Sequence, residues 1–141
     1  MRLALPTSIV AAGLVLATEA PAHHSYNEVF DFATCITVEG KLTRLDWRNP
    51  HIGIYVETTS ANGEAGEWRF EGLPTQMVAT EEGWSREWFT EGEQITVKGF
   101  PVNREGVRYA WVDEVIRADG TNLMHPRRHA RCAEARQITA R

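Results

Sequence analysis

Apolar and polar positions alternate along five segments of this chain, and such alternation is typical of strands that bury one face. In the first segment, 35–47, the buried face is predicted to carry Ile36, Val38, Gly40 and Leu42. The alternation then slips by one position before Leu45 and Trp47. Because a one-residue slip exchanges the two faces of a strand, the sequence predicts a β-bulge near Thr43 and Arg44.

Four shorter segments follow the first one. Their predicted inward residues are Ile52, Ile54 and Val56 in the second segment, Trp68 and Phe70 in the third, Ile95 and Val97 in the fourth, and Ala110, Val112 and Val115 in the fifth. The turn sequence Ala61-Asn62-Gly63 separates the second segment from the third and predicts a hairpin there. The fifth strand is predicted to span 107–117.

The strict alternation of apolar and polar residues stops between the third and fourth strands. Pro74 is suited to the first position of a helix, and Gly83 can end one, so the sequence predicts a helical segment between them with Met77 and Val78 facing inward. A second, shorter helical turn is expected after Ser85, which is a favourable N-cap residue. This turn would carry Trp88 and Phe89.

Three strands, a helical segment and two strands form the order of an OB-fold, a small five-stranded barrel. We therefore predict a mainly β protein, with an OB-fold-like barrel and a helical segment between strands 3 and 4. An open β-sandwich with a helical insert is the alternative. Because aromatic side chains supply much of the buried area in small cores, we interpret Trp47, Trp68 and Trp84 as core residues.

Residues 1–22 have the features of a secretory signal peptide. Arg2 supplies positive charge before an apolar run, and Ala20-Pro21-Ala22 forms a cleavage site. A cut after Ala22 makes His23 the new amino terminus, and a cut after Ala20 is the alternative. The apolar run is shorter than the about 20 residues that a transmembrane helix needs, which disfavours an uncleaved membrane anchor. We expect a periplasmic or secreted protein with no transmembrane span in the mature chain.

The rest of the chain is the size of one domain, which we divide into a barrel domain with its lead-in, 23–123, and a basic C-terminal tail, 124–141. The net charge is −4, although the tail holds five arginines and one glutamate, so the barrel is distinctly acidic. An acidic barrel argues against nucleic acid as a partner. We interpret the tail as a solvated, frayed terminus; the alternative is that it contacts anionic lipid or the acidic barrel.

Cys35 and Cys132 are the two cysteines of the chain. An even number of cysteines in an exported protein indicates a disulfide. Such a bond would close a long loop, stabilise the fold by about 4 kcal/mol, and tie the tail to the first strand. Two free thiols are the alternative.

Several spaced motifs carry a family resemblance. They are His23-His24-Ser25, Asp31, the segment from Val38 to Lys41, Trp47-x-Asn49-Pro50-His51, Trp68-x-x-Glu71, Gly83-Trp84, Glu91-Gly92 and Val97-x-Gly99. With these motifs the chain resembles the exported bacterial family of domain of unknown function 6152, over most of the mature sequence to about Asn122. The resemblance implies an exported, small β-rich domain and no established activity. The cysteines and the arginine tail lie outside the family pattern.

Histidine is the one chemistry-bearing residue type that shows a pattern. His23 and His24 follow the predicted cleavage site, and His51 begins the second strand beside the loop where OB-folds usually bind ligands. If the lead-in folds across that loop, three imidazoles and the new α-amine converge, and nitrogen-rich sites of this kind suit Cu(II). The alternatives are a structural role for His51, through hydrogen bonds to the turn, and a disordered terminus for His23 and His24.

The sequence contains no catalytic signature, such as a nucleophile elbow, a P-loop or an HExxH motif, which favours a non-enzymatic protein. Three hypotheses remain. The first is a binding module whose barrel mouth holds a small ligand, an oligosaccharide or a peptide. The second is a copper-binding protein that uses His23, His24 and His51. The third is a metal-free structural or interaction domain that binds another envelope protein.

Overall fold

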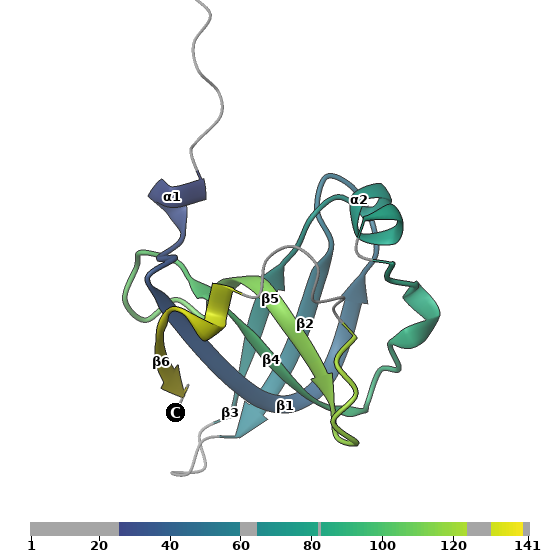
Figure 1. The fold of residues 1–141 in the computed structure, drawn as a ribbon. Helices are drawn as coiled ribbons and strands as arrows, with labels where there is room; N and C mark the ends of the chain where they lie inside the picture. Colours follow the sequence, from purple (N-terminus) through teal and green to yellow (C-terminus); the bar gives the residue numbers. More distant parts are fainter. Residues whose placement is uncertain (1–25, 60–64, 82, 124–130, 140–141) are drawn as a thin grey trace, which may run out of the picture.

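The computed structural model describes residues 26–59, 65–81, 83–123 and 131–139. Strands dominate this part of the chain: β1 (Thr34–Asp46), β2 (Gly53–Thr59), β3 (Ala65–Glu71), β4 (Gln94–Pro101), β5 (Tyr109–Arg117) and β6 (Arg136–Thr139). The short helices are α1 (Tyr26–Val29), α2 (Thr75–Thr80) and the 3₁₀ turns η1 (Arg86–Trp88) and η2 (Arg131–Ala133). Figure 1 shows α1 and α2 near the same end of the strands.

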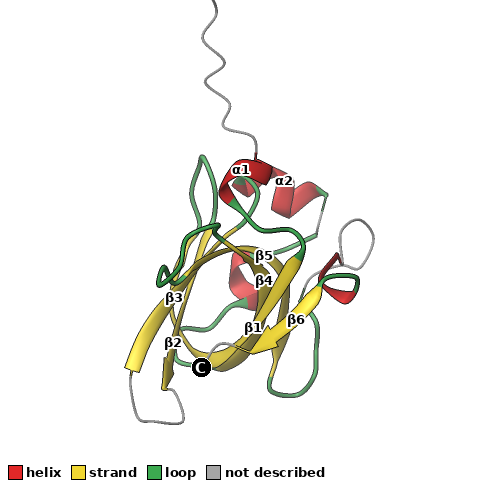
Figure 2. Cartoon of the chain, turned by 90° about the vertical axis from the view of Figure 1, so that its left-hand side faces the viewer, coloured by secondary structure: helices red, strands yellow, loops and turns green. Residues whose placement is uncertain are grey.

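Strands β1 to β5 close into a barrel. The sheet order is β2-β3-β5-β4-β1-β6, and an additional antiparallel pairing of β1 with β2 joins its ends. Strand β3 pairs with β5 in parallel, and the other barrel pairings are antiparallel. Figure 2 shows the strands curving around one interior. The predicted OB-fold-like barrel, with helical segments between β3 and β4, is confirmed, and the β1–β2 pairing excludes an open sandwich.

The predicted inward faces form the main core. Its fully buried members include Ile36, Val38, Leu42, Ile52, Ile54, Val56, Phe70, Val97, Ala110 and Val115. The register of β1 against β2 shifts between Leu42 and Arg44, so the predicted bulge is confirmed at Thr43. Beyond the bulge, Leu45 and Trp47 are partly buried against the core, as their place on the inward face required.

The helical segment differs in detail from its prediction. Helix α2 begins at Thr75, with Pro74 in the N-cap position rather than the first helical position. Val78 is buried as expected, but the prediction for Met77 is wrong because its side chain is 37% exposed. Met77 and Val78 are adjacent positions of a helix with about 3.6 residues per turn, so their side chains point in different directions, and Val78 is the one that faces the core. Trp84 is buried, whereas Trp68 is partly exposed where it packs against the core.

Two glycines allow the barrel strands to approach closely. A Cβ atom on Gly40 would lie 2.2 Å from the backbone oxygen of Glu57, and one on Gly99 would lie 2.2 Å from that of Trp111. Both distances are far below van der Waals contact, so a side chain at either position requires the backbone to move. Gly99 also marks the shift of register between β4 and β5.

A second, smaller core lies between the barrel and the two chain segments that flank it. It is formed by Phe30, Cys35, Phe100 and Cys132, with Phe32, Val102, Tyr109 and Trp111 packed around them. Cys35 and Cys132 form a disulfide, which confirms the predicted pairing. The bond holds η2 against β1, so residues from both ends of the domain cover one outer side of the barrel.

An additional strand, β6, follows Cys132 in the chain. Thr34 to Thr37 of β1 pair in parallel with Arg136 to Thr139 of β6, and Figure 1 shows β6 beside β1. The side chains of β6 are exposed, as expected for a solvated segment. The expectation of a frayed tail is wrong for residues 131–139, because the crosslink brings this backbone next to the free edge of β1. The rest of the predicted tail, including His125 and His129, lies outside the described residues.

Candidate functional site

The loop between β1 and β2 contains the Trp47-to-His51 motif, and each part of the motif makes a different contact. Trp47 packs against the main core. The Asn49 side-chain oxygen accepts hydrogen bonds from the Thr75 backbone N–H at 3.3 Å and from its hydroxyl at 2.9 Å. Since Pro74 offers no side-chain cap, Asn49 satisfies a free N–H at the start of α2. The loop and the helix are therefore joined.

His51 lies at the end of this loop, two positions before Gly53, which pairs with Glu71 at the end of β3. Two backbone hydrogen bonds hold it there, from Gly72 to the Ile52 carbonyl at 3.1 Å and from Ile52 to the Leu73 carbonyl at 3.2 Å. The His51 Nδ1 atom contacts the Glu71 carboxylate. The side chains are 25% exposed for His51 and 13% for Glu71, so solvent only partly screens this pair.

The second nitrogen of His51 faces the lead-in. Its Nε2 atom lies 3.2 Å from the Tyr26 hydroxyl of α1. An ionised carboxylate only accepts hydrogen bonds, so Nδ1 donates to Glu71, and in the neutral imidazole Nε2 is left as the acceptor. Tyr26, His51 and Glu71 thus form a hydrogen-bonded chain that joins α1, the β1–β2 loop and β3. Arg69 extends it, because its guanidinium lies 3.6 Å from the Glu71 carboxylate.

Aromatic contacts hold α1 over this end of the barrel. The Tyr26 ring packs edge-on against Trp111 at 4.9 Å between centroids, and His51 packs against the same Trp111 at 5.9 Å. Phe30, which follows α1, is buried against Trp111 as well. Tyr26 therefore brings the start of α1 beside His51 and the β1–β2 loop.

The structure places one of the three predicted metal ligands. His51 is held as described, whereas His23 and His24 lie outside the described residues. Within the described ranges, no three His, Cys, Asp or Glu side chains are grouped so that they could hold a metal ion. His51 is thus the single candidate ligand that the structure locates.

Sequence reasoning missed three members of this cluster: Tyr26, Glu71 and Trp111. Glu71 alternates with Trp68 and Phe70, which is the pattern of a solvated charge on a strand, and Tyr26 lies in the lead-in before the first strand, so neither residue is marked as a partner of His51. The available signal was that Asn-Pro-His and Trp-x-x-Glu both belong to the family pattern. Their pairing requires the β2–β3 register, in which Gly53 lies opposite Glu71.

No helix in the part of the chain described by the structure combines the length and the apolar character needed to cross a bilayer.

A search of curated proteins found no match. Among solved structures, the barrel is similar to the mitochondrial single-stranded DNA-binding protein Rim1 of S. cerevisiae. The TM-score is 0.47 at 8% identity, over 60% of this chain and 91% of that one. The model of a family of unknown function, DUF6152, matches residues 12–110. This match spans more than half of the sequence, and the chain therefore belongs to the DUF6152 family.

Proposed function

We propose that this protein is an exported binding module that holds Cu(II) at the end of the barrel where α1 meets the β1–β2 loop. The proposed ligands are the Nε2 atom of His51 and, after removal of residues 1–22, the α-amine and imidazole of His23, with His24 beside them. The observation that carries this proposal is the contact of His51 Nδ1 with Glu71.

Glu71 prepares His51 for a metal. Imidazoles that bind metals usually donate their other ring N–H to a carboxylate, which sets the tautomer and makes the metal-binding nitrogen more basic. His51 has this arrangement, with Nδ1 on Glu71 and Nε2 directed toward Tyr26. A metal at Nε2 would take the place of the Tyr26 hydroxyl hydrogen bond, at the cost of one exposed contact.

The predicted terminus is within reach of that nitrogen. His24 precedes Tyr26 by two positions and His23 by three, and an extended chain spans at most about 3.5 Å per residue. The α-amine and imidazole of His23 can therefore approach the space around Nε2 while Tyr26 stays on Trp111. A set of three or more nitrogen ligands favours Cu(II) over the other common divalent ions.

The mature terminus is the first quantity to measure. We expect the protein purified from the cell envelope to begin at His23, because the cleavage site ends at Ala22. Intact-mass spectrometry gives this directly. A mature chain that begins at Met1 would contradict both the export prediction and the terminal copper site.

Copper titrations of four matched chains test the site. We expect the chain that begins at His23 to bind Cu(II) more tightly than the same chain with one added amino-terminal glycine, which displaces the α-amine from His23. His51→Ala should also weaken binding, and Glu71→Gln should weaken it about tenfold to a hundredfold, the usual effect of an outer-shell partner. Calorimetry gives the affinities, and EPR reports the loss of nitrogen ligands.

The pH dependence has a definite sign. Protons compete with the metal for imidazole and amine nitrogens, so affinity should fall as pH drops through the ordinary histidine range near about 6.5. Equal affinities for the four chains would contradict a site at this position. Loss on glycine extension alone, with His51→Ala unchanged, would leave only a terminal chelate that does not use the fold.

One observation favours a second function, a metal-free structural or interaction domain of an envelope complex. The Tyr26–His51–Glu71 chain satisfies both ring nitrogens of His51 without a metal. In that case His51→Ala would lower the free energy of unfolding and leave copper affinity unchanged, and envelope proteins that co-purify with the wild-type chain would identify the partner.

A further inference from the structure

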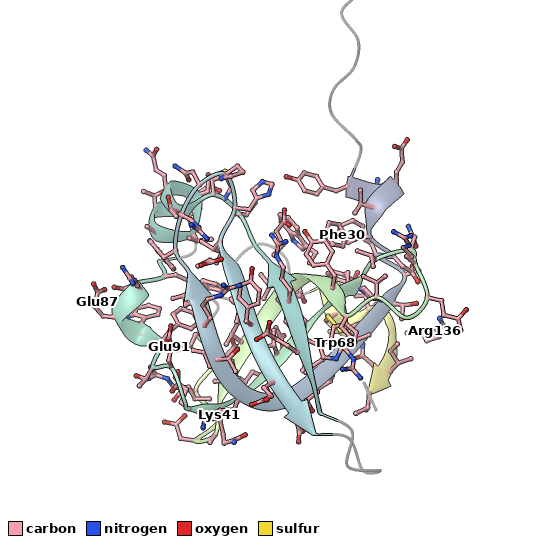
Figure 3. All side chains as sticks on the ribbon, turned by 180° about the vertical axis from the view of Figure 1, so that it is seen from behind. Phe30, Lys41, Trp68, Glu87, Glu91 and Arg136 are labelled. Atoms are coloured by element: carbon pink, nitrogen blue, oxygen red, sulfur yellow. A yellow bond between two sulfur atoms is a disulfide. The ribbon has the colours of Figure 1, made fainter. Side chains whose placement is uncertain are left out.

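A row of alternating arginine and tyrosine side chains crosses the outside of the barrel. Arg44 of β1 is paired in register with Tyr55 of β2, Tyr55 with Arg69 of β3, and Arg69 with Tyr109 of β5. Their neighbours Leu45, Ile54, Phe70 and Ala110 point toward the core. The four side chains therefore share the outer face, and we call them the Arg–Tyr row. Figure 3 shows β1 and β2 at the front with their outward side chains toward the viewer.

The arginines pack over the tyrosine rings. The Arg44 guanidinium carbon lies 3.8 Å from the centre of the Tyr55 ring, and that of Arg69 lies 5.0 Å from the centre of the Tyr109 ring. About half of each arginine side chain is exposed. Neighbouring strands are about 4.8 Å apart, so the row is about 14 Å long. It presents planar groups of two kinds, arranged by the sheet before any ligand binds.

The charge on this face is balanced. Asp46 lies 3.9 Å from Arg44 and 3.2 Å from Arg48, and Glu71 lies 3.6 Å from Arg69. Partial desolvation raises the pKa of Asp46, but the hydrogen bond from Arg48 and the charge of Arg44 outweigh it and hold that pKa below its ordinary value. Each guanidinium of the row therefore has a carboxylate beside it. A polyanion would meet these carboxylates and a polycation would meet the arginines.

Neutral polyhydroxyl chains suit such a surface. A sugar ring presents an apolar face, which can pack on an aromatic ring, and a rim of hydroxyls, which both donate and accept hydrogen bonds. Guanidinium groups supply only donors and carboxylates supply only acceptors, so the pairs Arg44–Asp46 and Arg69–Glu71 together satisfy a hydroxyl rim. These two pairs lie on β1 and β3, on either side of Tyr55 in β2, which favours a short oligosaccharide over a single sugar.

We propose that the Arg–Tyr row is a binding site for a neutral oligosaccharide. The row contains none of the proposed copper ligands, although its Arg69 pairs with Glu71, which also contacts His51. The two proposals can fail independently, because sugar binding is measured here on metal-free protein and copper binding without sugar.

NMR titration of the ¹⁵N-labelled mature chain, in the presence of a chelator, tests the proposal. The probes are cellohexaose, N-acetylchitohexaose and maltohexaose at millimolar concentration. We expect at least one of them to shift amide signals of β1, β2, β3 and β5, and Tyr55→Ala to weaken its binding about tenfold by loss of ring stacking. Arg69→Lys keeps the charge but loses the planar fork, so it should also weaken binding.

Trp88→Ala is the matched control, because Trp88 is an aromatic residue that is 40% exposed on η1, away from the row. It should leave the affinity unchanged. Signal dispersion in each spectrum shows whether a variant is folded. If Tyr55→Ala fails to fold, Arg69→Lys still tests the proposal, because the Arg69 side chain is half exposed. The proposal is overturned if none of the three probes binds, or if binding survives both row variants. It is also overturned if oligodeoxythymidylate or oligolysine binds the row more tightly than the sugars.

Discussion

Replacing Phe70 with alanine is expected to lower the free energy of unfolding by about 3–5 kcal/mol, the usual cost of truncating a buried phenylalanine. Phe70 is 0% exposed and is among the largest fully buried side chains of the described barrel. It lies in β3 between Ile54 of β2 and Ala110 of β5. Because strands on either side pair with β3, the barrel should relax only partially into the cavity. Urea denaturation followed by tryptophan fluorescence measures the loss.

Met77→Ala is the control for this experiment. Met77 is a large apolar side chain at the surface of α2, and surface substitutions usually change stability by less than about 0.5 kcal/mol. A Phe70→Ala variant as stable as the Met77→Ala variant would contradict the assignment of Phe70 to the centre of the core.

Removal of the disulfide should have an effect of similar size. Cys35 and Cys132 are 97 positions apart, and crosslinks that close loops of about 100 residues are worth up to about 4.7 kcal/mol in the chain-entropy model. We expect the Cys35→Ala/Cys132→Ala variant to lose about 2–5 kcal/mol of unfolding free energy. The amide protons of β6 should lose more exchange protection than those of the barrel, because β6 pairs with β1 alone.

A reducing agent supplies the matched comparison. Reduction of the wild-type protein should lower its stability to that of the double variant, and the double variant itself should not respond. If β6 kept its protection in the double variant, its pairing with β1 would be sufficient by itself, and our account of how the disulfide holds this segment would be wrong.

The candidate site shows where sequence reasoning ends. His51 was singled out by its position after Asn49-Pro50 and beside the predicted second strand, and the structure places it at that loop. Its partners could not be named, since Tyr26 is 25 positions away and Glu71 is 20. The Arg–Tyr row has the same origin: each member is an ordinary outward residue of its strand, and the row exists only through three strand pairings.

Alternation along the chain determined the barrel strands, their inward faces and the bulge at Thr43. Successive side chains of a strand point to opposite faces, so a strand with one buried face shows an apolar residue at every second position. A shift in this alternation can be seen within the segment itself. The disulfide followed from cysteine count and the predicted export. Only the tertiary structure decided which outward side chains meet: the contacts of Tyr26 and Glu71 with His51, the Arg–Tyr row, and the addition of β6 to β1. These contacts depend on strand register, barrel closure and the disulfide. Each brings together residues that are far apart in the chain, and the local sequence pattern does not indicate that they are neighbours.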